Sequence, residues 1–262
     1  MEELDGRCAI YRARSRNGRD FRIDAQPMFA PIGEGPFAPY ERGGVRDARV
    51  TRFDGAYYIT YLASSHYGYR LGLATTEDFT SVRRIALISE PDTKNGVLFP
   101  RKINGKYALL QRPQEGGSIW ISYSEDLVYW GEQEVVMTPR GGYWDYHRIG
   151  ASTVPIETDS GWLVIYYGIK VMPGGPLFRL GAAFLGMENP AEVRGRSNVP
   201  ILAPLERYER VGDVSNLVFS CGALLSDDRT ELEIYYGASD SCIALGTVRM
   251  KALERICNLG GS

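Results

Sequence analysis

The chain has 262 residues, enough for one large domain or two small ones. Its 30 lysines and arginines face 32 aspartates and glutamates, and this net charge of −2 argues against a nucleic-acid-binding surface, which carries a basic excess. The sequence holds no run of 18 apolar residues and no apolar signal core, so we expect neither a membrane segment nor a secretory leader. The four cysteines lack C-x-x-C spacing, which predicts buried free thiols rather than zinc ligands. We therefore also expect a cytoplasmic protein.

One phrase recurs along the chain: a turn with Gly, then alternating apolar and aromatic residues that end near a Tyr. Its five copies occupy residues 5–13, 54–63, 104–113, 160–169 and 230–239. The Asp-Gly and Asn-Gly pairs predict hairpins, and the period-2 alternation predicts strands. Successive copies lie roughly 50 to 70 residues apart, which is the spacing of propeller blades.

A second phrase follows four of these copies and predicts the third strand of each blade, at residues 69–79, 118–130, 178–190 and 242–250. After the first copy, residues 14–24 are short and charged instead. Only the segment from Lys251 onward has a helical pattern. The sequence therefore predicts an all-β fold, with residues 1–262 forming a single five-bladed β-propeller whose first blade is abbreviated. A β-sandwich is the competing architecture, but it would not need five similar units.

The first polar cluster that interrupts this pattern centres on Asp47, which stands between Arg46 and Arg49. A carboxylate between two guanidinium groups is commonly a structural ion pair with a lowered pKa. A general acid needs the opposite, a pKa raised toward the working pH. From these residues alone, the ion pair is the favoured interpretation of Asp47.

Three basic residues occupy similar positions in successive repeats. Lys94 lies in a Lys-Asn-Gly turn at a strand entrance, Arg112 follows the next strand, and Arg148 precedes a later one. Each alone fits a solvated surface cation. Together they predict one oxyanion or phosphate site at the mouth of the propeller, provided that their side chains converge.

The remaining chemistry-bearing residues give weaker signals. His147 and Asp145 accompany Trp144, but a single His without a fixed partner is usually structural. With two histidines in the chain, a His-rich metal centre is excluded, and we expect neither a metal nor an organic cofactor. The P-loop, G-x-S-x-G and H-E-x-x-H motifs are absent from the sequence.

Longer segments between about residue 43 and residue 250 show a resemblance to a known family. They read GGVRDARVTRFDGAYYITY, KNGVLFPRKINGKYALLQRP, RIGASTVPIETDSGWLVIYYG, ILAPLERYERVGDVSNLVF and IYYGASDSCIALG. In this order they resemble glycoside hydrolase family 130, the β-mannoside phosphorylases and related β-mannosidases. The resemblance implies a five-bladed propeller that cleaves β-mannosides with inversion at the anomeric carbon.

The resemblance also implies roles for individual residues. Asp47 would be the proton donor, acting through a hydroxyl of the sugar, while inorganic phosphate attacks from the other face to give α-mannose 1-phosphate. Tyr167 replaces a phosphate-contacting His of the family and would donate one hydrogen bond without charge. The other implied phosphate ligands are Lys94, Asn95, Arg112 and Arg148, and the implied sugar contacts are Arg12, Glu209 and Asp240.

Three functions follow from this comparison. The leading one is a phosphorylase for a β-1,2- or β-1,4-mannoside oligosaccharide, with inorganic phosphate as co-substrate and no cofactor. The second is an inverting β-mannosidase in which a carboxylate such as Glu209 activates water. The third is a catalytically weak sugar-binding propeller. We expect no nucleic-acid or membrane partner, and the sequence leaves open the oligomeric state, a homo-oligomer included.

Overall fold

The computed structural model describes residues 7–259, which form an all-β structure with short helices at its edges. Four antiparallel sheets of three to five strands follow one another along the chain. Each sheet is built from strands that are consecutive in sequence, so each sheet corresponds to one repeat.

The first sheet comprises β3 (Gly44–Phe53), β4 (Ala56–Ser65), β5 (Gly68–Thr76) and β6 (Arg83–Leu87). The second comprises β7 (Thr93–Leu98), β8 (Tyr107–Pro113), β9 (Ile119–Ser124) and β10 (Gly131–Met137). The third comprises β11 (Arg148–Ala151), β12 (Ile156–Thr158), β13 (Gly161–Met172), β14 (Gly175–Leu185) and β15 (Val193–Arg196). The fourth comprises β16 (Val218–Leu225), β17 (Glu231–Ala238) and β18 (Cys242–Arg249).

The remaining elements are short. The N-terminal segment forms a two-stranded sheet from β1 (Ala13–Arg14) and β2 (Arg22–Ile23). The helical elements are η1 (Ala38–Tyr40), η2 (Glu115–Gly117), α1 (Arg207–Arg210) and α2 (Met250–Ile256).

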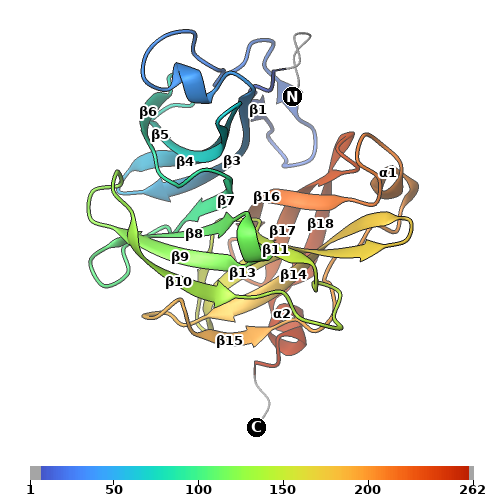
Figure 1. Ribbon diagram of the computed structural model, residues 1–262. Coiled ribbons are helices and arrows are strands. Elements are labelled where there is room, and N and C mark those ends of the chain that lie inside the picture. Colours follow the sequence, from blue (N-terminus) through green and yellow to red (C-terminus); the bar gives the residue numbers. More distant parts are fainter. Residues whose placement is uncertain (1–6, 260–262) are drawn as a thin grey trace.

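The four sheets surround a common centre. In Figure 1 the first strand of each sheet (β3, β7, β11 and β16) lies near the middle of the view, and β6, β10 and β15 lie at the periphery. Among these inner strands β7 contacts both β3 and β11, and β16 returns to contact β3. The expected all-β, propeller-like ring is therefore confirmed.

The repeat phrases fall where the sequence predicts them. The later copies of the first phrase are the second strands β4, β8, β13 and β17, and the second phrase gives the third strands β5, β9, β14 and β18. The predicted C-terminal helix is α2. In the first copy, residues 5 and 6 lie outside the described residues, and the rest contributes isolated bridges through Cys8 and Ile10 and, at Ala13, the start of the two-residue strand β1. The described part of the chain thus holds four larger sheets and one N-terminal sheet of two short strands.

The hydrophobic core is a series of layers between neighbouring sheets. One layer joins the first and second sheets, a second joins the second and third, and a third joins the third and fourth together with α2. A fourth layer packs the N-terminal residues Met28 and Phe29 against the first sheet. Both faces of most sheets are therefore covered, which leaves the strand ends as the places where polar side chains can gather.

Glycine at the start of β3 permits one close approach in this arrangement. Gly44 has a φ of +107°, and a Cβ at this position would lie 2.4 Å from the backbone nitrogen of Cys8. Any other residue would clash with the N-terminal segment and strain the backbone. Gly44 therefore fixes the N-terminal segment against the inner strand of the first sheet.

Two expectations about the whole chain are sharpened by the structure. All four cysteines are free, but only Cys257 is fully buried and Cys242 is exposed, so the expectation of uniformly buried thiols was wrong. Cys242 begins the outermost strand of its sheet, where one side faces solvent. Within residues 7–259, no helix has the length and apolar composition needed to cross a membrane.

Candidate active site

The three basic residues predicted to converge do lie together. Lys94 is the second residue of β7, Arg112 pairs with it on β8, and Arg148 is the first residue of β11. The charges of Arg112, Arg46 and Arg148 all act on Lys94, as does the carboxylate of Asp47. The starts of β3, β7 and β11 therefore gather the predicted donor and the predicted phosphate ligands around one point.

Asp47 and Asn95 occupy the same special position in successive inner strands. In β3 the pairing with β4 slips between Arg46 and Arg49, and in β7 the pairing with β8 slips between Lys94 and Val97. Asp47 and Asn95 lie in these bulges, each with a φ of +56°. Asp and Asn tolerate this left-handed conformation better than other side chains, and a bulge redirects the side chain that it carries.

Arg49 holds the bulge that presents Asp47. Its Nη1 donates a hydrogen bond of 2.6 Å to the backbone oxygen of Asp47, and its Nε donates one of 3.2 Å to the oxygen of Ser152. Within residues 7–259 neither Arg46 nor Arg49 forms an ion pair with the Asp47 carboxylate. The ion-pair interpretation of Asp47 was therefore wrong, because the neighbouring arginine binds the backbone of Asp47 and leaves its carboxylate for other partners.

Lys94 lies where positive charge is crowded. Burial lowers its pKa from the ordinary value, the charge of Arg112 lowers it further, and Asp47 partly opposes both. Its Nζ lies 3.8 Å from the centre of the Tyr69 ring, a contact that favours the charged form. We call Arg46, Arg49, Lys94, Arg112 and Arg148 the basic cluster. A multiply charged anion would relieve the repulsion among these side chains.

Asn95 is oriented by two donors. Arg112 Nε donates to Asn95 Oδ1 over 3.1 Å, and Tyr167 Oη donates to the same oxygen over 2.9 Å. Since arginine cannot accept a hydrogen bond, the Asn95 oxygen must face Arg112. The Asn95 amide nitrogen is then directed away from both, as a donor available to an anion.

Tyr167 is buried at the junction of these groups. Burial raises its pKa, while Arg112, Arg49 and Arg148 oppose the rise, so the hydroxyl stays protonated at neutral pH. Its proton is engaged with Asn95 rather than directed into open space. Tyr167 therefore positions Asn95 in this structure, and its predicted direct contact with phosphate remains a prediction.

Asp240 approaches the same point from the fourth sheet. It lies in the turn after β17 with a φ of +51°. Burial raises its pKa, and the negative charges of Asp47 and Asp213 raise it further. The pKa of the Cys221 thiol is raised to about 11, mainly by burial. The charge of Arg49 lowers this pKa, and the charge of Asp47 raises it. The fourth sheet thus brings Asp240 and Cys221 within electrostatic range of Asp47.

The other two predicted sugar contacts are engaged elsewhere. Arg12 forms an ion pair with Asp24 at 2.8 Å and donates to the backbone oxygen of Phe79, in the turn after β5. Glu209 Oε2 accepts hydrogen bonds from the backbone nitrogens of Leu205 and Glu206 in a capping box of α1. Sugar binding by Arg12 and Glu209 stays a prediction, and within the described residues both have structural partners.

The pKa of Glu209 reflects this structural role. Its Oε1 accepts a 2.7 Å hydrogen bond from Tyr236, and only 3% of the residue is exposed. Burial raises the pKa, but the hydrogen bonds from Glu206, Tyr236 and Leu205 outweigh it and leave the pKa below its ordinary value. Such a carboxylate is a weak proton acceptor, which argues against Glu209 as the general base of a hydrolase.

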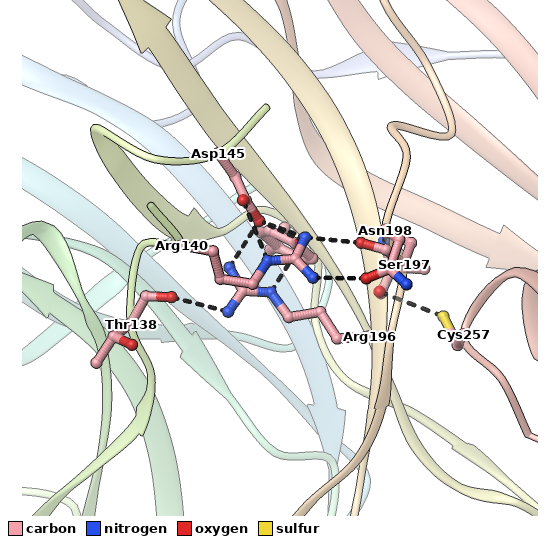
Figure 2. A network of polar contacts seen from close by, with 9 residues as sticks. Thr138, Arg140, Asp145, Arg196, Ser197, Asn198 and Cys257 are labelled. Carbon is pink, nitrogen blue, oxygen red and sulfur yellow. Dashed lines mark hydrogen bonds and ion pairs between the residues drawn. The ribbon is translucent and has the colours of Figure 1, made fainter. Parts of the chain in front are cut away.

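The segment that carries Asp145, His147 and Arg148 divides into two parts. Arg148 joins the basic cluster, whereas Asp145 is fully buried and accepts hydrogen bonds from Arg140, Arg196 and Tyr166. Figure 2 shows the two arginines converging on Asp145 and reaching on to Thr138, Ser197 and Asn198. We call Asp145, Arg140, Arg196 and Tyr166 the Asp145 network. His147 is exposed and contributes its backbone nitrogen to Ile169, so it forms part of neither cluster.

Sequence reasoning assigned no role at the site to three residues. Arg46 and Arg49 belong to the basic cluster, but they were considered only as ion-pair partners of Asp47. Asp47 and Asn95 are polar residues near the starts of two inner strands, and this repetition was the signal that could have revealed the paired bulges. Cys221 sits at a third such slip, between Ser220 and Gly222 of β16. Within residues 7–259, no group of three or more His, Cys, Asp or Glu could hold a metal ion.

A family model described as beta-1,4-mannooligosaccharide phosphorylase matches residues 3–259. The chain belongs to glycoside hydrolase family 130. The resemblance carried by the five quoted segments is thereby confirmed. The family 130 match covers all four larger sheets as well as the N-terminal one.

Two curated relatives of the family are similar over most of the chain. The Beta-1,2-mannobiose phosphorylase of Listeria innocua is 36% identical over 236 residues, 88% of this chain and 64% of that protein. The Beta-1,4-mannooligosaccharide phosphorylase of Ruminococcus albus is 37% identical over 204 residues, 76% of this chain and 61% of that protein. This family 130 chain therefore spans less than two thirds of the length of either relative.

A solved structure supports the same placement in family 130. The Listeria innocua Beta-1,2-Mannobiose phosphorylase, in complex with beta-1,2-mannobiose, superimposes with a TM-score of 0.87 at 34% identity. The match covers 94% of this chain and 68% of that chain. Nearly every described strand thus has a counterpart in a family member.

Proposed function

We propose that this chain is an inverting β-mannoside phosphorylase. The observation that carries the proposal is the basic cluster, in which Lys94, Arg112 and Arg148 gather near the Asp47 carboxylate, which has no ion-pair partner among residues 7–259. A hydrolase needs no such concentration of positive charge around a water molecule, whereas a phosphorylase needs it to bind phosphate. Curated relatives named as β-1,2- and β-1,4-mannoside phosphorylases support the same class of substrate.

The proposed reaction assigns one task to each side of the site. The basic cluster and the Asn95 amide hold inorganic phosphate, and one phosphate oxygen attacks the anomeric carbon of the mannosyl unit. The glycosidic carbon–oxygen bond breaks, and the proton that leaves Asp47 passes through a sugar hydroxyl to the departing oxygen. The products are α-mannose 1-phosphate and the remaining sugar. Asp240 lies close enough to Asp47 for the two charges to interact, so it is the best-placed of the predicted sugar contacts.

Two further parts of the proposal concern the fold and the cell. We assign the N-terminal segment to the position of a fifth blade, because Cys8 bridges to Gly44 of the first sheet while the Tyr235 hydroxyl of the fourth sheet donates to Gly18. The segment therefore connects the two sheets that would flank such a blade. We also expect a cytoplasmic enzyme that uses phosphate as co-substrate without a cofactor.

The experiment is incubation with β-1,2- and β-1,4-mannobiose, with and without inorganic phosphate. Phosphate-dependent release of α-mannose 1-phosphate supports the proposal and identifies the linkage. Phosphate-independent release of mannose would instead identify a β-mannosidase, for which another group than Glu209 would have to serve as base. Binding without turnover would identify a sugar-binding propeller.

A further inference from the structure

Several exposed or half-exposed side chains form an aromatic surface beside the active site that the proposed reaction does not use. The Tyr40 and Tyr67 rings lie 5.8 Å apart, and the His66 ring lies 3.8 Å from that of Tyr67. Arg70 stacks on Tyr40, with its Cζ 5.5 Å from the ring centre. We call Tyr40, His66, Tyr67 and Arg70 the tyrosine rim.

The tyrosine rim lies at the same end of the first sheet as Asp47. The turn between β4 and β5 carries His66 and Tyr67, and it follows Ser64, which pairs with Gly44 at the start of β3. Tyr40 belongs to η1, just before β3. The turn between β4 and β5 lies one to two strand spacings from β3, so His66 and Tyr67 lie roughly 5 to 10 Å to the side of the inner strand.

The rim also lies on the opposite face of the first sheet from the basic cluster. Tyr69, which contacts Lys94, packs in the core layer shared with the second sheet. Arg70 pairs with Ala63 and shares its face, which packs against Phe29 of the N-terminal segment. Adjacent residues of a strand point to opposite faces, and here they separate the phosphate side from the rim side.

Inversion requires the nucleophile and the leaving group to lie on opposite sides of the anomeric carbon. With phosphate held by the basic cluster, the leaving sugar must extend away from Lys94 and Arg112. The first sheet presents its other face in that direction, and the tyrosine rim is the aromatic surface at its edge. A sugar chain that extends from the inner strand toward this edge would bring its second leaving-side unit to the tyrosine rim.

We propose that the tyrosine rim binds the second leaving-side sugar of a β-mannoside longer than a disaccharide. This inference rests on the proposed function. Aromatic rings offer apolar faces to the C–H faces of a pyranose, while the tyrosine hydroxyls, His66 and Arg70 can hydrogen-bond its hydroxyl groups. Tyr67 keeps 55% of its surface exposed, so its ring is open to a ligand. Arg70 is itself fixed by a hydrogen bond to the oxygen of Ser89, and it steadies Tyr40.

The test measures sugar binding by calorimetry in the Asp47→Asn variant, which prevents turnover during the titration. The probes are β-1,2- and β-1,4-linked mannobiose and mannotriose. Tyr67→Ala should weaken mannotriose binding about tenfold, the loss of one stacking contact, and leave mannobiose binding unchanged. Tyr67→Phe should restore most of the mannotriose affinity. The matched control is Tyr129→Ala, an 80% exposed tyrosine in the turn after β9, at the other end of its sheet.

The outcomes separate this inference from the proposed function. Unchanged mannotriose binding in Tyr67→Ala, or equal weakening of mannobiose and mannotriose binding, contradicts sugar binding by the tyrosine rim. If the wild-type chain cleaves mannobiose with phosphate while Tyr67→Ala binds mannotriose normally, the proposed function stands without the rim. If mannotriose binding depends on Tyr67 but no phosphate-dependent cleavage occurs, the rim stands and the proposed function fails.

Discussion

The Asp145 network and the basic cluster both gather arginines in the interior, but they differ in charge balance. In the network two arginines share one fully buried carboxylate, at 2.9 Å from Arg140 and 2.7 Å from Arg196, and Tyr166 donates a further hydrogen bond. The basic cluster holds five cations, and the one carboxylate that acts on Lys94 is that of Asp47, which forms no ion pair within the described residues. Proteins compensate buried charges that serve only structure, so the excess of positive charge in the basic cluster supports the proposed phosphate site.

This contrast also explains why residues three apart in sequence have different roles. Asp145 and Arg148 belong to the same short segment before β11. Asp145 turns toward β13 and β15, where it joins the third sheet to the loop that precedes it. Arg148 begins the inner strand and faces Lys94 and Tyr167. The strand start thus separates a carboxylate with three hydrogen-bond donors from an arginine of the basic cluster.

The largest expected effect is on turnover. Replacing Asp47→Asn removes the proposed proton donor, and kcat should fall on the order of 10³-fold. Its melting temperature should stay near that of the wild type, because no described side chain relies on the Asp47 carboxylate for an ion pair. Initial rates of α-mannose 1-phosphate release, with Asp159→Asn as an exposed control, provide the measurement. Substantial residual turnover would remove Asp47 from the mechanism.

The Asp145 network should respond in the opposite way. Asp145→Asn leaves Arg140 and Arg196 without their counter-ion, and the free energy of unfolding should fall by about 3 kcal/mol. The KM for phosphate should not change, since the network lies apart from the basic cluster. Urea denaturation combined with kinetics on the folded protein makes the measurement. A raised KM with unchanged stability would contradict the division between the two regions.

A smaller effect is expected at Tyr167, which acts through Asn95. Tyr167→Phe removes one of two hydrogen bonds to the Asn95 oxygen, so the KM for phosphate should rise roughly fivefold, about 1 kcal/mol, with kcat nearly constant. Arg112 still holds the amide, which is why the loss stays modest. Steady-state kinetics at varied phosphate separates the two constants. An equal fall in kcat would show that Tyr167 acts on the reacting atoms instead.

The smallest effect at neutral pH concerns Lys94, whose pKa burial and Arg112 lower from the ordinary 10.5. Protonated Lys94 attracts phosphate, so the KM for phosphate should be flat well below that pKa and rise as the pH rises through it. The rise should begin at a lower pH than an ordinary lysine would give. Lys94→Arg keeps its charge in this range and should flatten the profile. A wild-type profile that is already flat would exclude Lys94 as a phosphate ligand.

Much of the fold could be predicted from local patterns. The turns before Ala56 and Tyr107 and the alternation behind them predicted β4 and β8, because hairpin geometry and strand period depend on residues next to each other. The N-terminal repeat was harder to predict, since its phrase gives isolated bridges at Cys8 and Ile10 and a single strand residue, Ala13. Its pairing depends on distant residues such as Phe29 and Gly44, which no local pattern encodes.

Part of the site could also be predicted from the sequence. Lys94, Arg112 and Arg148 were predicted to converge, although Lys94 and Arg112 pair within the second sheet and only Arg148 comes from the next one. The contact of Arg49 with the Asp47 backbone was missed, because a charge pattern does not tell whether a guanidinium binds a carboxylate or a carbonyl oxygen. The occupation of Glu209 by the α1 capping box was missed as well, although Glu206 and Glu209 have capping spacing.

The sequence by itself determined the ring of sheets and the residue types that face its centre, since strand period and repeat spacing are local properties. Only the tertiary structure decided which of those charges are compensated. That property depends on distances between side chains far apart in sequence: Asp145 with Arg196, Asn95 with Tyr167, and Arg49 with Ser152. Interaction between charges falls steeply with separation and exposure, so a few ångströms distinguish a buried ion pair from a free carboxylate.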